Sequence, residues 1–237
     1  MPIASGSRTH QNASTSATQS GEGWTLTGTK NVVPAADQAD AFIVPAMAGG
    51  QLALFLVERT AKGVSTQGYR TQDGGRAGDV TLQAAAAQLI TTDGLTALEH
   101  GVDIGIAAAC AEAVGVMDQT VAITVDYMNT RKQFGVAIAT FQALRHRLAE
   151  AQVRTNGLYW LAMKAAATLD AGDAALAALH AQESARSCVY DFHQFLGAMG
   201  MTLEHPLHLW TYRLKALIGD LGGRGGQALV AANALWG

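Results

Sequence analysis

The sequence has few of the residues on which disulfide-bonded and metal-binding proteins depend. Its only cysteines, Cys110 and Cys188, lie far apart in Ala-rich stretches. They fit neither a disulfide framework nor a zinc site, and we interpret them as small buried residues of helices. The seven histidines lack a ligand spacing such as HExxH. No metal site is therefore predicted.

Basic charge and long apolar runs are also scarce. The net charge is −3 over 237 residues, so nothing indicates a nucleic-acid partner. There is no secretory signal, no lipidation motif and no uninterrupted apolar run of about 20 residues, the length that a membrane span requires. The sequence predicts a cytoplasmic protein without a membrane partner. Its length suits one large domain or two small ones.

Proline becomes rare after about residue 95, where only Pro206 remains, and the chain changes character at that point. Before it, short strand-like runs are separated by Gly- and Asp-containing turns. These runs occupy residues 24–28, 41–46, 52–58 and 79–82. Regular short strands predict a small β-sandwich or barrel. The Ser-, Thr- and Gln-rich stretch 12–23 is predicted to be a loop.

The rest of the chain is rich in Ala and Leu, with apolar residues at helical spacing. Helices are predicted at residues 104–130, 141–169, 174–197, 206–220 and 227–235. Residues 170–173 read Asp-Ala-Gly-Asp, a helix stop followed by a new N-cap. Lengths and short connections predict an antiparallel four-helix bundle. The expected fold class is α+β, with a β domain over residues 1–92 and a helical bundle domain over 93–237.

Three motifs are more specific than the fold, which alone carries no function. The first is GWTLTGTKN at residues 23–31, with Ala39-Asp40 following. The second is RKQFG at residues 131–135, with Phe141-Gln142 following. The third is QFLGAMG at residues 194–200, followed by Glu204-His205-Pro206. In this order and spacing the motifs resemble those of the acyl-CoA dehydrogenase family.

The resemblance implies a fold of three parts, which are an N-terminal helical domain, a middle β domain and a C-terminal four-helix bundle. Gly6-Ser7-Arg8 resembles the stretch that follows the first of these domains. We therefore expect the N-terminal domain to be absent. The chain is then either a fragment or a naturally short protein.

The resemblance also implies the chemistry. In the family, a carboxylate removes the α-proton of an acyl-CoA thioester while hydride leaves the β-carbon for FAD. The adenosine diphosphate arm of FAD crosses a subunit interface. Carried over by position, the FAD contacts fall on Arg131, Gln133, Phe134, Phe141, Gln142, Gln194, Gly197 and Gly200.

Each carried-over role has a plainer alternative. Arg131 would pair with the pyrophosphate, for which a guanidinium fork is suited, or would form a surface salt bridge. Gly197 and Gly200 would allow close approach of the backbone to the same arm, or would simply end a helix. Two departures stand out: Ala198 replaces a glycine, and Val32-Val33-Pro34 replaces the family's phrase with Trp and Thr beside the flavin ring.

The catalytic base is the largest departure. The usual glutamate position falls on Leu221, and the position used by a second subgroup falls on Gly105. Asp220 is the nearest candidate, but one residue on a helix rotates a side chain by roughly 100°. A capping or solvated aspartate is the competing interpretation of Asp220.

Some bacterial family members are heteromers of two homologous chains that act on bulky acyl-CoAs such as steroid side-chain thioesters. One chain carries the base and the other lacks it. GDLGG at residues 219–223 and PLHLW at 206–210 resemble phrases of the base-lacking chains. We therefore expect an FAD-dependent oxidoreductase subunit that binds acyl-CoA in a homo- or hetero-oligomer formed through the bundle, with a catalytic homologous subunit.

Two alternatives stay open. One is a self-sufficient dehydrogenase that uses Asp220 or an unrecognised base. The other is a non-catalytic oligomerisation scaffold of the same fold that no longer binds flavin. The sequence does not indicate which acyl group would be used.

Overall fold

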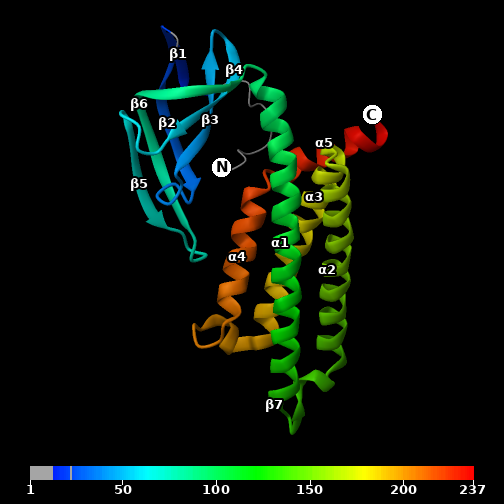
Figure 1. Ribbon diagram of the computed structural model, residues 1–237. Helices are drawn as coiled ribbons and strands as arrows, with labels where there is room; N and C mark the ends of the chain where they lie inside the picture. Colours follow the sequence, from blue (N-terminus) through cyan, green and yellow to red (C-terminus); the bar gives the residue numbers. More distant parts are fainter. Residues whose placement is uncertain (1–12, 22) are drawn as a thin grey trace. The chain divides into compact units, whose positions relative to one another are not determined.

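The computed structural model describes residues 13–21 and 23–237 (Figure 1). Gly6-Ser7-Arg8 lies outside the described residues. Two compact units make up the chain, and the boundary between Val102 and Asp103 falls inside helix α1 (Gly94–Thr130). The first unit is dominated by strands and the second by helices, so the predicted α+β fold class is confirmed.

The first unit is a small β barrel. Its described strands are β1 (Ser16–Ser20), β2 (Gly23–Pro34), β3 (Ala41–Ala48), β4 (Gln51–Glu58), β5 (Val64–Arg70) and β6 (Arg76–Thr91). Five of them close a ring in the order β1-β2-β6-β4-β3, in which only the β1–β3 pairing is parallel. The remaining strand, β5, pairs with β6 alone.

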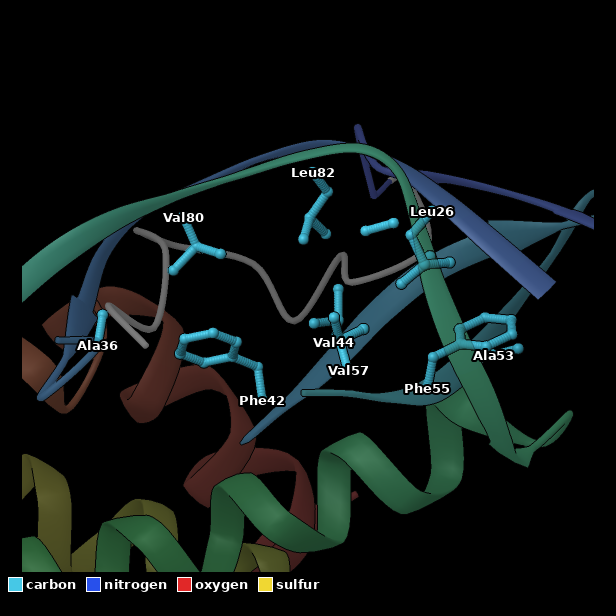
Figure 2. Close-up of a cluster of buried hydrophobic side chains, with 11 residues drawn as sticks. Leu26, Ala36, Phe42, Val44, Ala53, Phe55, Val57, Val80 and Leu82 are labelled. Carbon is cyan, nitrogen blue, oxygen red and sulfur yellow. The ribbon is translucent and has the colours of Figure 1, made fainter. Parts of the chain in front are cut away.

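The barrel core follows from the alternation of side chains along each strand. On β3, Phe42, Val44 and Ala46 are buried while Ile43 is exposed. Figure 2 shows Phe42 and Val44 beside buried side chains of the other strands. The buried cluster comprises Leu26, Ala36, Phe42, Val44, Ala46, Ala53, Phe55, Val57, Val80, Leu82 and Ala85. A closed ring with its apolar residues inside leaves few open strand edges.

The strand prediction was incomplete. The stretch 12–23, expected as a loop, contains β1, which pairs with β2 from Ser16↔Thr27 to Ser20↔Gly23. β5 was not predicted, and β6 is much longer than residues 79–82. β1 and β5 are polar and mostly exposed, so ladder hydrogen bonds rather than apolar burial hold them in place. That kind of stabilisation leaves little trace in the hydrophobic pattern.

The second unit contains the greater part of α1 and the helices that follow it. These are α2 (Gln142–Thr168), α3 (Ala171–Leu196), α4 (Leu207–Asp220) and α5 (Arg224–Trp236). α3 packs against α2, α4 and α5. Arg213 of α4 forms a bidentate ion pair with Glu112 of α1, with oxygen contacts at 2.5 and 2.8 Å. The predicted helical bundle is confirmed, and α1 begins ten residues before the predicted start at residue 104.

The turn between α2 and α3 forms as the sequence predicts. Leu169 ends α2 in the left-handed conformation, with φ 52°. Asp170 then caps α3, because its carboxylate accepts hydrogen bonds from the amides of Gly172 and Asp173 at 2.9 and 3.0 Å. The two helices therefore reverse direction within a very short connection. α3 is Ala-rich, so its small side chains permit close packing on several sides.

Both cysteines are buried within helices, as predicted, and neither forms a disulfide. Burial raises the pKa of the Cys110 thiol to about 12 and that of the Cys188 thiol to about 11. They therefore act as small apolar residues. α1 is long and apolar enough to cross a membrane by length and composition alone. Buried residues such as Ile106 and Met117 recur along it, and a core helix of a soluble protein has the same properties.

Candidate functional site

The second motif forms a hairpin at the C-terminal end of α1. Strands β7 (Lys132–Gln133) and β8 (Val136–Ala137) pair through Gln133↔Val136, which leaves Phe134 and Gly135 as a two-residue turn. Both turn residues have positive φ, 53° and 84°. Such turns favour Asn-Gly, and a phenylalanine in the left-handed region costs about 1–2 kcal/mol. The fold therefore holds Phe134 in a backbone conformation that its side chain disfavours.

The Phe134 side chain gains little burial in return, because 91% of it is exposed. Its ring meets the half-buried Phe141 edge to face, with 6.0 Å between centroids. Phe141 is the N-cap residue of α2, and Gln142 is the exposed first residue of that helix. The hairpin and the start of α2 thus present two aromatic rings and an amide on one surface. A strained, exposed aromatic residue is a feature of binding sites.

Arg131 lies between α1 and the hairpin. Its amide donates to the Tyr127 carbonyl at 2.8 Å, and its own carbonyl accepts from the Ile138 amide at 2.9 Å. The side chain is exposed, as is that of Gln133. Among residues 13–21 and 23–237, no carboxylate forms an ion pair with the Arg131 guanidinium. The alternative interpretation, a surface salt bridge, therefore has no partner in this part of the chain.

The third motif forms the end of α3 and the 3-10 turn η2 (Gly197–Met201). Gln194 is exposed. Gly197 is the C-cap residue with φ 59° and ψ −132°, a conformation that favours glycine, and the space beyond its Cα is open. Gly200 is buried, and a Cβ there would lie 2.9 Å from the His193 carbonyl oxygen. Chain reversal therefore requires both glycines, whatever they bind.

One side chain brings the second and third motifs together. The hydroxyl of Tyr127, one helical turn before Arg131, donates to the carbonyl of Leu196 at 3.2 Å. The Tyr127 ring also meets His205 edge to face. The arginine hairpin and the glycine turn thus lie at the same end of the bundle, where Figure 1 shows them at the lower end of α1.

The ring of His193 joins the 3-10 turn η2 to helix α4. Nδ1 of His193 lies 2.7 Å from the Gly200 carbonyl oxygen, and Nε2 lies 3.1 Å from the Thr211 hydroxyl. Sequence reasoning identified neither Tyr127 nor His193. Their partners here are mainly backbone carbonyls, which no sequence motif reveals.

The expected base positions lie elsewhere. Asp220 is the exposed last residue of α4, about 20 Å along that helix from its first turn. Leu221 is buried, with 1% exposure, and its carbonyl accepts from the Gln227 side chain at 2.6 Å. Gly105 is exposed in α1, and a Cβ there would meet no atom within 4 Å. Neither Leu221 nor Gly105, the two positions at which the family's base is expected, therefore provides a carboxylate.

The first motif stabilises the barrel. A Cβ at Gly28 would lie 2.8 Å from Cα of Thr15, so only glycine fits there. The Lys30 ammonium donates to the Pro45 carbonyl at 2.9 Å, and burial lowers the pKa of this amine. Val32 has φ 55° and lies at an irregularity of β2, where its amide donates to Asp79 at 2.9 Å. Val32 and Val33 thus complete the strand.

The groups at the hairpin end of the bundle fit one arm of a dinucleotide. The Arg131 guanidinium, which pairs with no carboxylate in the described part of the chain, suits a diphosphate. The exposed Phe134 ring suits an adenine face, and side-chain amides offer hydrogen bonds. Since the side chains of Arg131, Gln133, Phe134, Gln142 and Gln194 are all exposed, a bound molecule would reach them without rearrangement of the core.

Both parts of the chain match a known family. Residues 92–219 match the family described as acyl-CoA dehydrogenase, C-terminal domain, and residues 3–84 match its middle domain. The chain belongs to the acyl-CoA dehydrogenase family. Among curated proteins it is similar to the acyl-CoA dehydrogenase FadE27 of Mycobacterium tuberculosis, with 29% identity over 87% of this chain and 59% of that protein.

Two solved structures have the same fold. A variant of the Tcur3481-Tcur3483 steroid ACAD superposes with a TM-score of 0.85 and 28% identity, covering 94% of this chain and 62% of that one. The ChsE4-ChsE5 complex from Mycobacterium tuberculosis gives a TM-score of 0.84 and 27% identity, covering 99% of this chain and 65% of that one. This chain thus spans less than two thirds of the length of each of these relatives.

Proposed function

We propose that this chain is a flavoprotein subunit of an acyl-CoA dehydrogenase that binds the adenosine diphosphate arm of FAD and lacks its own catalytic base. A homologous subunit would supply the carboxylate that removes the α-proton. The reaction is the α,β-dehydrogenation of an acyl-CoA thioester. The observation that carries the proposal is Leu221, an apolar residue buried to 1% exposure at the position where the family places its glutamate.

Burial decides what Leu221 can do. A carboxylate at such a position would lose its hydration and would need a charged or hydrogen-bonding partner. A leucine there packs into the helical unit instead, and its carbonyl fixes the turn to α5 through Gln227. Asp220, one residue earlier, is the exposed last residue of α4. The turn between α4 and α5 therefore serves packing and provides no catalytic carboxylate at Leu221.

The chemistry left to this chain is binding. When bound, FAD supplies the hydride acceptor of the reaction. Arg131 would neutralise the diphosphate, with a fork geometry that matches two phosphate oxygens. Phe134 and Phe141 would cover the adenine, and Gln133, Gln142 and Gln194 would offer hydrogen bonds. Gly197 and Gly200 shape the turn beside them.

Two structural relatives support a heteromeric assembly. One is named as the ChsE4-ChsE5 complex and the other as the Tcur3481-Tcur3483 steroid ACAD, so each joins two differently named chains. We infer that the exposed hairpin of this chain serves a flavin shared with a partner chain. A bulky acyl-CoA, such as a steroid side-chain thioester, is the substrate class that we propose, and the name of the Tcur3481-Tcur3483 steroid ACAD supports it.

The test is co-expression of this chain with homologous dehydrogenase chains, beside expression of this chain alone. The proposal predicts visible flavin absorbance and acyl-CoA-dependent dye reduction in the complex only. Turnover by the purified chain alone at the rate of the complex would contradict the absence of a base. A complex that forms and stays colourless would contradict flavin binding.

The colourless outcome would favour the scaffold alternative. One observation supports that alternative: Val32, exposed and in the left-handed region, stands where relatives cover the flavin ring with Trp and Thr. A valine there offers no aromatic face. Flavin content measured on the purified complex separates the two functions.

A further inference from the structure

The turn after α3 is fixed by side chains from three helices. Tyr127 of α1 donates to the Leu196 carbonyl at 3.2 Å. His193 of α3 contacts the Gly200 carbonyl at 2.7 Å. Thr211 of α4, which is only 1% exposed, contacts the far ring nitrogen of His193 at 3.1 Å. We call residues 196–201 the glycine segment.

The hydrogen-bond partners fix the proton position on His193. A carbonyl oxygen only accepts, so Nδ1 carries the hydrogen that it donates to Gly200. In the neutral ring, Nε2 is then an acceptor for the Thr211 hydroxyl at 3.1 Å, a shorter contact than the one of 3.5 Å between that hydroxyl and the His208 carbonyl. Both nitrogens of this half-buried ring therefore have a hydrogen-bond partner. The ring links α4 to the glycine segment and restricts their relative movement.

His193 also contacts Gly200 through its backbone. Its carbonyl oxygen lies where a Cβ on Gly200 would come within 2.9 Å, and the same oxygen accepts from the Gly197 amide. His193 thus contacts the glycine segment at both Gly197 and Gly200. A change in the ring would release the Gly200 carbonyl while α3 itself stays intact.

The outer side of the glycine segment faces solvent. Gly197 is exposed, Met201 is 80% exposed and Leu203, just beyond the segment, is 74% exposed. Hydrogen bonds from Tyr127 and His193 fix the inner side of the segment, while its outer side exposes backbone atoms and apolar side chains. Such an arrangement suits a surface whose shape is set before a ligand or subunit meets it.

We propose that His193, backed by Thr211, is a positioning residue that holds the glycine segment in the shape that contacts the diphosphate arm of FAD. The inference rests on the proposed function. His193 itself lies beneath the segment and acts through the Gly200 carbonyl. Tyr127 fastens the other end of the segment and joins it to the Arg131 hairpin.

The test uses substitutions at His193 in the full chain, co-expressed with a homologous dehydrogenase chain. His193→Leu removes both ring hydrogen bonds. His193→Asn keeps an N–H donor near the Nδ1 position and so keeps the bond to Gly200. His180→Leu is the matched control, because His180 lies on the same helix and bonds the Arg154 carbonyl at 3.0 Å, far from the glycine segment.

Two quantities are measured: the dissociation constant for FAD, and the hydrogen exchange of the Gly197 and Thr202 amides. Loss of a buried hydrogen bond predicts weaker FAD binding by roughly tenfold for His193→Leu, and a change below about threefold for His193→Asn and His180→Leu. Exchange of the two amides should rise in His193→Leu only. Thr211→Val should give an intermediate loss, because it removes the hydroxyl that contacts Nε2.

The outcomes separate the two proposals. If the wild-type complex binds no FAD, the proposed function fails, and the positioning role fails with it. If the wild type binds FAD and His193→Leu binds it equally well with unchanged exchange, only the positioning role fails. Equal losses in His193→Leu and His193→Asn also overturn it, because the retained donor would then have no effect.

Discussion

The ring of Phe134 meets the ring of Phe141 edge to face, with 6.0 Å between centroids and 84° between planes. Phe134 belongs to the hairpin turn and Phe141 caps α2, so the contact fixes the hairpin against the helix that follows. Phe134 adopts a left-handed backbone and stays 91% exposed. Because Phe134 contributes so little to the stability of the free chain, we infer that its role is to bind a ligand.

Phe134→Asn tests that explanation. Asparagine tolerates the left-handed region, which offsets the lost ring contact, so the free energy of unfolding should stay within about 1 kcal/mol of wild type. FAD retention should fall clearly. Leu169→Asn is the control, because Leu169 has φ 52° and is also exposed, at the other end of α2. Thermal denaturation and flavin content are measured for both. Full flavin content in Phe134→Asn would refute a contact with adenosine.

Arg131→Gln should separate binding from stability. The side chain is exposed and has no ion-pair partner in the described part of the chain, so unfolding free energy should change by less than about 0.5 kcal/mol. FAD affinity should fall by about tenfold or more, because a charged hydrogen bond to phosphate is lost. Lys132→Gln, the adjacent exposed cation, is the control. Equal losses in both variants would indicate general attraction by positive charge.

Asp220→Asn tests whether this aspartate is a base. Removal of a general base slows catalysis by roughly 10²–10⁴-fold. We expect the complex to keep its dehydrogenation rate within about twofold, because the base belongs to the partner chain in the proposed function. The rate of acyl-CoA-dependent dye reduction decides the matter. A hundredfold loss without unfolding would show that Asp220 does act in catalysis.

His205 gives a pH-dependent prediction. Burial, and then the charge of His208, hold the pKa of His205 below its ordinary value of 6.5. The unfolded chain therefore takes up this proton first as the pH falls, so stability is full above 6.5 and declines below it. The amide of Leu207 donates to Nδ1 of His205 at 3.2 Å, a bond that protonation would break.

The measurement is the melting temperature on either side of the ordinary histidine pKa. His205→Asn keeps an acceptor for the Leu207 amide and removes the titrating group, so its melting temperature should fall less on acidification than that of the wild type. His146→Gln, on the exposed side of α2, should keep the wild-type slope. Identical slopes in all three proteins would contradict the prediction.

The cysteines should be chemically silent in the folded protein. Burial raises the pKa of Cys110 to about 12 and that of Cys188 to about 11, so almost no thiolate exists near neutral pH. A chromogenic disulfide reagent should find no thiol in the native chain and both thiols after denaturation. Rapid reaction of one thiol in the native protein would show that its helix opens readily.

The hydrophobic pattern predicted the elements that bury apolar faces. Strand β3 and helix α3 both follow from the spacing of their buried residues, and Asp170 caps α3 where the sequence placed a cap. The polar strand β1 escaped prediction, since the ladder to β2 holds it. Composition also cannot reveal such bonds, because every residue except proline has the same backbone donor and acceptor.

Some residues of the candidate site could be predicted from the sequence and others could not. Arg131 and Phe134 were found because they belong to a motif, and the roles assigned to them remain predictions. Tyr127 and His193 were missed, because each is recognised only by the carbonyl that folding brings within 3.2 or 2.7 Å. The two glycines were found by their motif, and the structure adds that chain reversal demands them.

Strand β6 has a consequence for how the barrel assembles. It pairs with β5 through residues 76–82, with β2 through residues 77–87 and with β4 through residues 88–91. The ring closes only when this last strand is complete, and until then β4 has an open edge prone to aggregation. A truncated chain that ends at residue 84, where the middle-domain match stops, would keep that edge open. One that extends through Thr91 would retain the whole ring.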